Sequence, residues 1–177
     1  MINAKVIFYS TGVLVILLLA GCSTDCNLAK MEEENIATIR YIHAEVAKGN
    51  MGAFDEVLAP NYVRHCQAMP PELQEMHGSE GLKAFVGDFI SSVSDFSETF
   101  DVIVADSDKV AYVTTMTATQ TGPMGELPAS GKKFTCVNII IQRFEKGKIA
   151  ETWVSWDNVA MLSQLGFFPP PALDSKP

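Results

Sequence analysis

A carboxylate close to two indoles is the first arrangement in this sequence that could carry chemistry. Asp157 follows Trp153 and Trp156. Apolar rings around a carboxyl group disfavour its charged form, which is one way in which proteins make a general acid or base of it. Asp157 is therefore a candidate catalytic residue. The alternative is structural, because aspartate is also a favoured cap for the helix expected to begin here.

A histidine near a tyrosine provides the second candidate proton carrier. His65 follows Tyr62 by three residues, and we expect both near the mouth of a cavity. An imidazole can exchange a proton in the physiological range and can also hydrogen-bond a ligand. The alternative is a hydrogen-bonded loop histidine without a function. The other two histidines, His43 on a helix and His77 in a loop, are expected to have no functional role.

Two amide side chains interrupt an otherwise apolar strand. Asn138 and Gln142 share a face with Cys136 and Ile140 by strand alternation. A buried amide needs a hydrogen-bond partner, which would be either a ligand or a group at the end of a barrel-like sheet. The candidate ligand-binding residues are therefore these two amides together with Tyr62, Trp153 and Trp156.

The spacing of apolar residues predicts helices first and strands afterwards. Three- and four-residue spacing predicts helices over 31–48, 51–58 and 79–93. Alternation predicts antiparallel strands over 99–105, 110–120, 133–144 and 149–156, and a last helix over 157–165 ends at Gly166. This order favours an α+β fold, with a strongly curved antiparallel sheet around the N-terminal helices and a cavity at its open end.

The first 21 residues have the anatomy of an export signal. One charge, Lys5, precedes an apolar run from Val13 to Ala20. That run is shorter than the roughly 20 residues of a membrane-spanning helix. The segment 19–22, Leu-Ala-Gly-Cys, resembles the lipobox of bacterial lipoproteins, whose cysteine is lipidated and becomes the mature N-terminus.

The lipobox resemblance implies an exported protein held on a membrane by a lipid anchor on Cys22. Residue 23 is not the aspartate that retains many lipoproteins in the inner membrane. In a Gram-negative source we therefore expect the periplasmic side of the outer membrane. An uncleaved N-terminal anchor is the alternative.

The composition narrows the range of partners. The net charge of −8 provides no basic surface for phosphates, which argues against nucleic acid. No Cys/His spacing indicates a zinc site, and we expect neither a metal nor a cofactor. Three cysteines besides Cys22 remain, Cys26, Cys66 and Cys136. Whether Cys66 and Cys136 form a disulfide or are separate buried thiols stays open.

Several sequence blocks carry a resemblance to a known family. They are residues 34–50, 55–65, 81–86, 147–153, 156–157 and 162–166. In their order and spacing, over about residues 32–167, they resemble the SnoaL-like polyketide cyclases (ester cyclases) of the NTF2-like superfamily. The resemblance implies a cone-shaped α+β barrel with a buried apolar pocket, often dimeric through the outer face of its sheet, and chemistry without a metal.

The catalytic groups of that family are not carried over. Its cyclases use an aspartate as acid and base with a histidine nearby. In this sequence the aspartate position falls on Val154 and the histidine position on Ile140. Because neither side chain can move a proton, the resemblance leaves the activity undecided.

The chain is thus expected to comprise a signal peptide (1–21), a tether (22–30), a SnoaL-like domain (31–167) and a proline-rich tail (168–177). Three functions are compatible with it. The first is an enzyme that moves a proton on a small, largely apolar carbonyl compound through Asp157 or His65. The second is a lipoprotein that binds such a molecule unchanged. The third is a protein-interaction module using the outer face of the sheet.

Overall fold

The structure, a computed structural model, describes residues 5–168, with side chains from residue 26 onward. Its helices are α1 (Lys5–Ala47), α2 (Ala53–Val57), the short 3-10 helix η1 (Pro71–Leu73), α3 (Gly78–Ser91) and α4 (Asn158–Leu165). Its strands are β1 (Leu58–His65), β2 (Glu75–His77), β3 (Val93–Asp106), β4 (Lys109–Gln120), β5 (Lys133–Glu145) and β6 (Lys148–Trp156).

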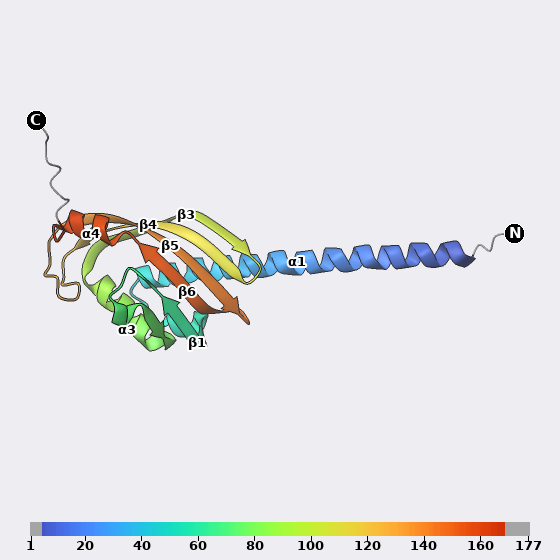
Figure 1. Cartoon of the computed structure of the whole chain (residues 1–177), viewed down its shortest axis with the longest axis horizontal. Coiled ribbons are helices and arrows are strands. Elements are labelled where there is room, and N and C mark those ends of the chain that lie inside the picture. Colours follow the sequence, from blue (N-terminus) through green and yellow to red (C-terminus); the bar gives the residue numbers. More distant parts are fainter. Residues whose placement is uncertain (1–4, 169–177) are drawn as a thin grey trace, which may run out of the picture.

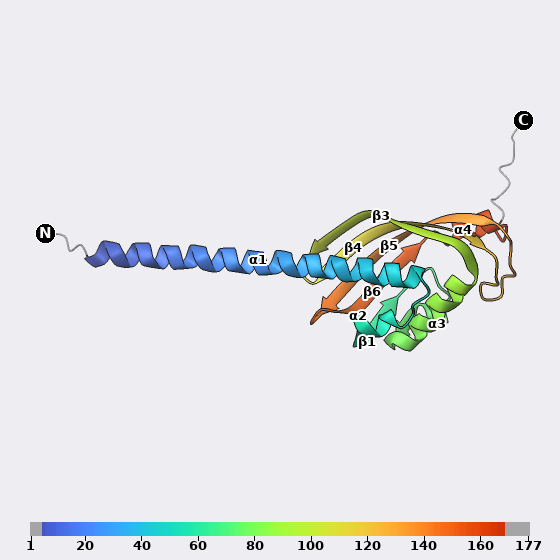
Figure 2. The same cartoon turned by 180° about the vertical axis from the view of Figure 1, so that it is seen from behind.

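The six strands form one curved sheet in the order β2-β1-β6-β5-β4-β3. Strands β3 to β6 pair as an antiparallel meander, and β1 joins its edge by pairing parallel to β6. The end of α1, together with α2 and α3, lies against the concave side (Figures 1 and 2). The expected α+β class with a sheet wrapped around helices is confirmed.

The four predicted strands do pair antiparallel, but the sheet has two further strands, β1 and β2, and the parallel pairing of β1 with β6 makes it mixed. The apolar periodicity of the sequence does not reveal strand β1, because the inward side of this strand includes a charged residue. Tyr62 and Arg64 are buried, whereas Val63 and His65, which alternate with them, are half-buried. The hydrophobic alternation that marks a half-buried strand is therefore broken. Strand β2 has three residues, too few for any periodicity.

Helix α1 begins at Lys5, well before the expected start near residue 31. The segment 22–30, expected to be a tether, is part of this helix. Figures 1 and 2 show this helix projecting far beyond the sheet. The predicted lipidation of Cys22 and the tail from residue 169 onward lie outside the described side chains and residues. No helix in the described part is both long and apolar enough to span a membrane.

Turn residues connect the strands as the sequence predicts. Lys146 and Gly147 both have positive φ, +52° and +75°. This is the geometry of the two-residue turn whose twist matches a hairpin, and it joins β5 to β6. Gly166 ends α4 with φ +87°, a left-handed conformation that glycine adopts without strain.

The core divides into two clusters. The larger one packs Ile39 and Ile42 of α1 against the middle of the sheet, at Tyr112 and Ile140. The smaller one lies beneath α4, where Leu165 packs on Phe134, Ala118 and Cys136. The larger cluster includes much of the wall of the cavity described next.

Candidate functional site

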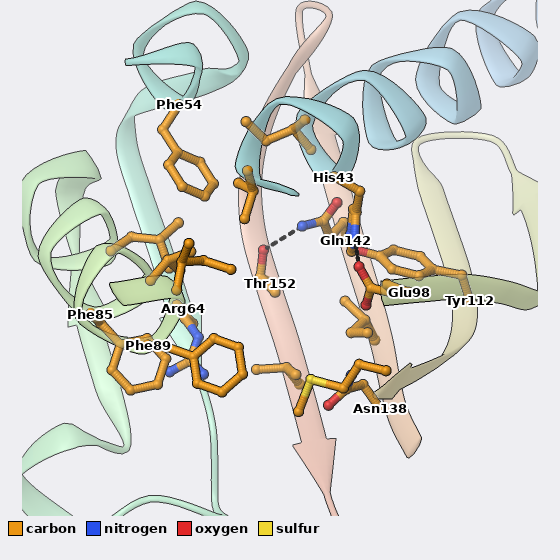
Figure 3. Close-up of a pocket in the computed structure, with 18 of the residues that line it drawn as sticks. His43, Phe54, Arg64, Phe85, Phe89, Glu98, Tyr112, Asn138, Gln142 and Thr152 are labelled. Carbon is orange, nitrogen blue, oxygen red and sulfur yellow. Dashed lines mark hydrogen bonds and ion pairs between the residues drawn. The ribbon is translucent and has the colours of Figure 1, made fainter. Parts of the chain in front are cut away.

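A cavity of about 200 Å³ lies between the concave face of the sheet and helices α1, α2 and α3 (Figure 3). The helices contribute mainly apolar side chains, including Phe54, Leu82, Phe85 and Phe89. At roughly seven times the volume of a liquid water molecule, the cavity admits a small molecule. Its polar lining residues are His43, Tyr62, Arg64, Glu98, Tyr112, Asn138, Gln142 and Thr152.

Strand alternation decides which residues of β1 reach the cavity. Tyr62 and Arg64 point inward and line it, whereas His65 is on the other face of the strand. There the His65 ring stacks on Trp153, with centroids 5.6 Å apart and an interplanar angle of 19°. Its Nε2 lies 3.0 Å from Glu151 Oε1. The expectation that His65 lies at the cavity mouth is therefore wrong, because the residue lines a groove on the outer face of the sheet instead.

The two tryptophans on β6 also lie apart from the cavity lining. Trp153 faces outward and is 38% exposed. Trp156 points inward, but it packs in the smaller core cluster and donates from Nε1 to Asn158 Oδ1 at 2.8 Å. Tyr62, Asn138 and Gln142 line the cavity, while the other two candidate ligand-binding residues do not.

Asp157 caps helix α4. Its Oδ1 accepts a hydrogen bond from the backbone N–H of Ala160 at 2.9 Å, and the residue is exposed and does not line the cavity. Asp157 is therefore a helix cap, as the structural alternative predicts. It is not placed to act as a general base on a ligand in the cavity. The indoles do not enclose its carboxylate, because Trp153 faces the other side of the sheet.

We expect Asp157→Ala to destabilise the protein by about 1 kcal/mol, the usual value of an N-cap. Asp157→Asn keeps a good cap and should cost little. Urea unfolding of both variants measures the difference, and ligand binding in the cavity should be unchanged. Equal and large losses in both variants would show that the charge, rather than the cap, is needed.

The predicted inward face of β5 is confirmed. Asn138, Ile140 and Gln142 alternate into the cavity. Asn138 Nδ2 donates to Thr114 Oγ1 at 3.2 Å, and Gln142 Nε2 donates to Thr152 Oγ1 at 3.2 Å. The Oε1 atom of Gln142 is buried without a partner among the described residues, so a ligand could donate a hydrogen bond to it.

The two positions that correspond to the family's acid–base groups face each other across β5 and β6. Ile140 pairs in register with Val154, and both line the cavity. They form an apolar wall at the place where the resemblance would put histidine and aspartate. Any proton transfer in this cavity must use other residues.

A cluster of three other residues can move protons there. His43 Nδ1 lies 2.6 Å from Glu98 Oε2, and His43 Nε2 lies 3.1 Å from the Tyr112 hydroxyl. All three residues line the cavity, and Figure 3 shows His43 reaching from α1 toward Glu98 on β3 and Tyr112 on β4. Phe100 packs edge-on against the imidazole, 5.0 Å between centroids, and helps to fix its orientation.

The surroundings decide which of these groups carries charge. Burial alone raises the pKa of Glu98, but its hydrogen bond to His43, the charge of His43 and a hydrogen bond from Thr114 outweigh burial, so the pKa is lowered. Burial, with the negative charge of Glu98 and the nearby Tyr62, raises the pKa of Tyr112 well above its usual value. At neutral pH Glu98 is therefore a carboxylate and Tyr112 is a protonated phenol.

Tyr62 is a second buried phenol in the cavity wall. Burial raises its pKa to about 12, although a hydrogen bond with Thr152 and the charge of Arg64 act in the opposite direction. The Tyr62 hydroxyl therefore stays protonated at any physiological pH.

Sequence reasoning missed this cluster because its members lie on three separate elements. His43 was given no role, and Glu98 lies one residue before the strand predicted at 99–105. One signal was available. His43 follows Ile39 by four residues and precedes Val46 by three, which puts it on the apolar side of its helix. A histidine on the buried side of a helix needs a polar partner.

In the described part of the chain, no group of three His, Cys, Asp or Glu side chains is arranged to hold a metal ion. Cys66 and Cys136 are both buried and are not bonded to each other. The two cysteines are therefore separate buried thiols, which is one of the two alternatives that the sequence left open.

The convex face of the sheet carries a groove of about 310 Å³. Its lining has few groups that could act on a ligand. The lining residues are His65, Gln67, Ile139, Ile141, Trp153, Val154 and Ser155. Ile139, which is 59% exposed, and its neighbours on β5 form an apolar outer surface.

A curved mixed sheet closed by N-terminal helices around a cavity defines the cone-shaped fold of the NTF2-like superfamily. Residues 37–165 match the model of the SnoaL-like polyketide cyclase family. The chain belongs to this family. No curated protein matches it in sequence.

Solved structures agree with that assignment. TsrD from Streptomyces laurentii is 28% identical with a TM-score of 0.69, and the match covers 77% of this chain and 98% of TsrD. IdmH from Streptomyces antibioticus, a proposed polyketide cyclase, is 28% identical with a TM-score of 0.63, covering 75% and 98%. An LEH-like epoxide hydrolase from M. tuberculosis shares the fold at 13% identity, with a TM-score of 0.59 and coverage of 76% and 90%.

Proposed function

We propose that this protein binds a small, largely apolar carbonyl compound in its inner cavity and moves a proton on it through His43, Glu98 and Tyr112. The observation that carries the proposal is the hydrogen-bonded chain from Glu98 through His43 to Tyr112 in the wall of an otherwise mostly apolar cavity. Membership of the SnoaL-like family supports it. The acid–base residues differ from Asp157 and His65, which the sequence suggested.

The proposed chemistry follows from the hydrogen bonds. The step requires the neutral tautomer of His43 that donates from Nδ1 to Glu98 and accepts at Nε2 from the Tyr112 hydroxyl, which the two distances allow. A proton leaving the carbon next to the ligand carbonyl passes to the Tyr112 oxygen while Tyr112 gives its own proton to His43. The resulting imidazolium is stabilised by the Glu98 carboxylate, and the reverse transfer returns a proton to the ligand.

The test uses 1-indanone, a ketone small enough for the cavity. The full-length protein in lipid nanodiscs is incubated with it in D2O, and NMR follows deuterium uptake next to the carbonyl. We expect faster exchange than with buffer or empty nanodiscs. Exchange no faster than in these blanks would contradict the catalytic proposal.

A second candidate function is binding without conversion, which the apolar pair Ile140 and Val154 favours. A binder would hold 1-indanone with saturable affinity and would not accelerate its exchange. Binding and exchange measured on the same sample therefore separate the two functions.

We also propose that the protein is an exported lipoprotein anchored through Cys22, with the domain on the periplasmic side of the outer membrane if the source is Gram-negative. The support is the lipobox-like segment 19–22. Two acyl chains or more would hold it stably, since one chain binds a membrane only marginally. The mass of the N-terminal peptide of membrane-extracted protein tests this. An unmodified peptide containing Met1 would contradict it.

The outer face of the sheet is proposed to form a homodimer. Val102, Val137, Ile139 and Ile141 are all at least 40% exposed there, and exposed apolar patches commonly mark interfaces. Ile139→Glu puts a charge in the centre of this surface and should convert a dimer into a monomer. Sedimentation equilibrium of residues 27–177 checks the change, with Ala44→Glu at an exposed position of helix α1, away from the outer face of the sheet, as control. A wild-type monomer, or a dimer that survives Ile139→Glu, would contradict the interface.

A further inference from the structure

Arg64 is a charged residue of the cavity wall that forms no ion pair or side-chain hydrogen bond within the described part of the protein. Its side chain comes from β1 and is 4% exposed. Its Nη1 atom is buried and has no hydrogen-bond partner among the described residues. Figure 3 shows Arg64 beside Phe85 and Phe89, across the cavity from His43 and Glu98.

Two aromatic rings hold the guanidinium without satisfying its N–H groups. The central carbon lies 4.9 Å from the ring centre of Phe85 and 5.9 Å from that of Trp156. Such contacts attract the cation and orient its plane. They provide no acceptor for the buried Nη1 atom, so the cost of taking this donor out of water is not recovered.

No other group in the described residues neutralises Arg64. None of the ion pairs found there includes it. Glu98, the acidic residue of the cavity wall, contacts His43 and does not pair with Arg64. A buried charge without a partner is strongly unfavourable, and proteins retain such a group where a ligand supplies the counter-charge.

We propose that Arg64 binds a carboxylate on the ligand, so that the substrate is a small keto acid with an apolar body. This inference rests on the proposed function and adds to it the class of substrate. A planar carboxylate matches the fork of a guanidinium with two parallel hydrogen bonds. A phosphate dianion fits less well, because one arginine in an apolar wall neutralises half of its charge. The carboxylate then lies at Arg64 and the ketone at Tyr112.

The test compares two probes that have the same shape and differ in charge. They are 3-phenylpropanoate and 3-phenylpropanamide, titrated calorimetrically into the full-length protein in nanodiscs with empty nanodiscs as background. We expect the carboxylate to bind at least about tenfold more tightly, since a charge-assisted bond contributes 1.4 kcal/mol or more and this corresponds to a factor of ten. Arg64→Met should abolish the preference, and Arg64→Lys should retain part of it.

A wild-type protein that does not distinguish the probes, whether both bind or neither does, would overturn the proposal. So would a carboxylate preference that survives Arg64→Met. If Arg64→Met does not fold, the wild-type comparison and Arg64→Lys decide the matter. The readout is binding and not turnover. A protein that fails to exchange deuterium but still prefers the carboxylate would therefore contradict the proton-transfer function alone.

Discussion

His43→Gln is expected to lower the rate of deuterium exchange into 1-indanone by about 10²- to 10⁴-fold, the usual contribution of a positioned acid–base group. Glutamine can still hydrogen-bond to Glu98 or Tyr112, but it cannot take up the proton that Tyr112 releases. Binding of 1-indanone should change little, because the apolar wall of the cavity is intact. The loss should therefore appear in the rate at saturation, measured by NMR over a range of ketone concentrations.

The chain offers a matched control for this variant. His77 also pairs with a glutamate, with Nε2 2.8 Å from Glu75 Oε1, but it is exposed and does not line the cavity. His77→Gln should exchange 1-indanone at the wild-type rate. Equal rates in wild type and His43→Gln would remove His43 from the chemistry.

Glu98→Gln is the second change with a large expected effect. Glutamine no longer stabilises the imidazolium that forms during proton transfer, and exchange should slow by about 10- to 100-fold. The variant should also be less stable at pH 7 by about 1.5–3 kcal/mol, the range for a hydrogen bond to a charged group. The Glu98 side chain is 14% exposed, so solvent screens this interaction only weakly.

The pH dependence of the stability difference has a definite sign. Folding lowers the pKa of Glu98 below its ordinary value of 4.5, so its contribution is complete above that value and is lost as the pH falls through the folded-state pKa. Urea unfolding at several pH values should show a wild-type advantage that is constant near neutrality and shrinks below pH 4.5. Glu75→Gln at the exposed pair is the control and should show little change. An advantage that grows in acid would contradict the assigned charge state.

The hydrophobic periodicity was sufficient for most of the fold. The long strands β4 and β5 alternate because one side packs on the core, and the turn at Lys146 and Gly147 sets the register of the hairpin from β5 to β6. Strand β1 escaped because Arg64 faces inward. An inward charge breaks the apolar alternation by which a strand is recognised. Here that charge belongs to Arg64, which lines the cavity.

Strand alternation also decided which residues of the candidate site could be predicted. Asn138 and Gln142 were found because an amide is conspicuous on an apolar strand of known alternation. His65 was misplaced because its strand was not recognised, and an error of one position reverses the face of a strand residue. The contact between His43 and Glu98 joins residues 55 positions apart. It depends on how the end of α1 is seated against β3, which local spacing does not specify.

The most direct test of the account is to map where 1-indanone binds by NMR chemical-shift changes. We predict that the signals of His43, Tyr112 and Thr152, which line the inner cavity, move on titration. Those of His65 and Trp153 on the outer groove should stay in place. Shifts confined to His65 and Trp153 would put the ligand on the convex face and contradict the inner cavity as the functional site.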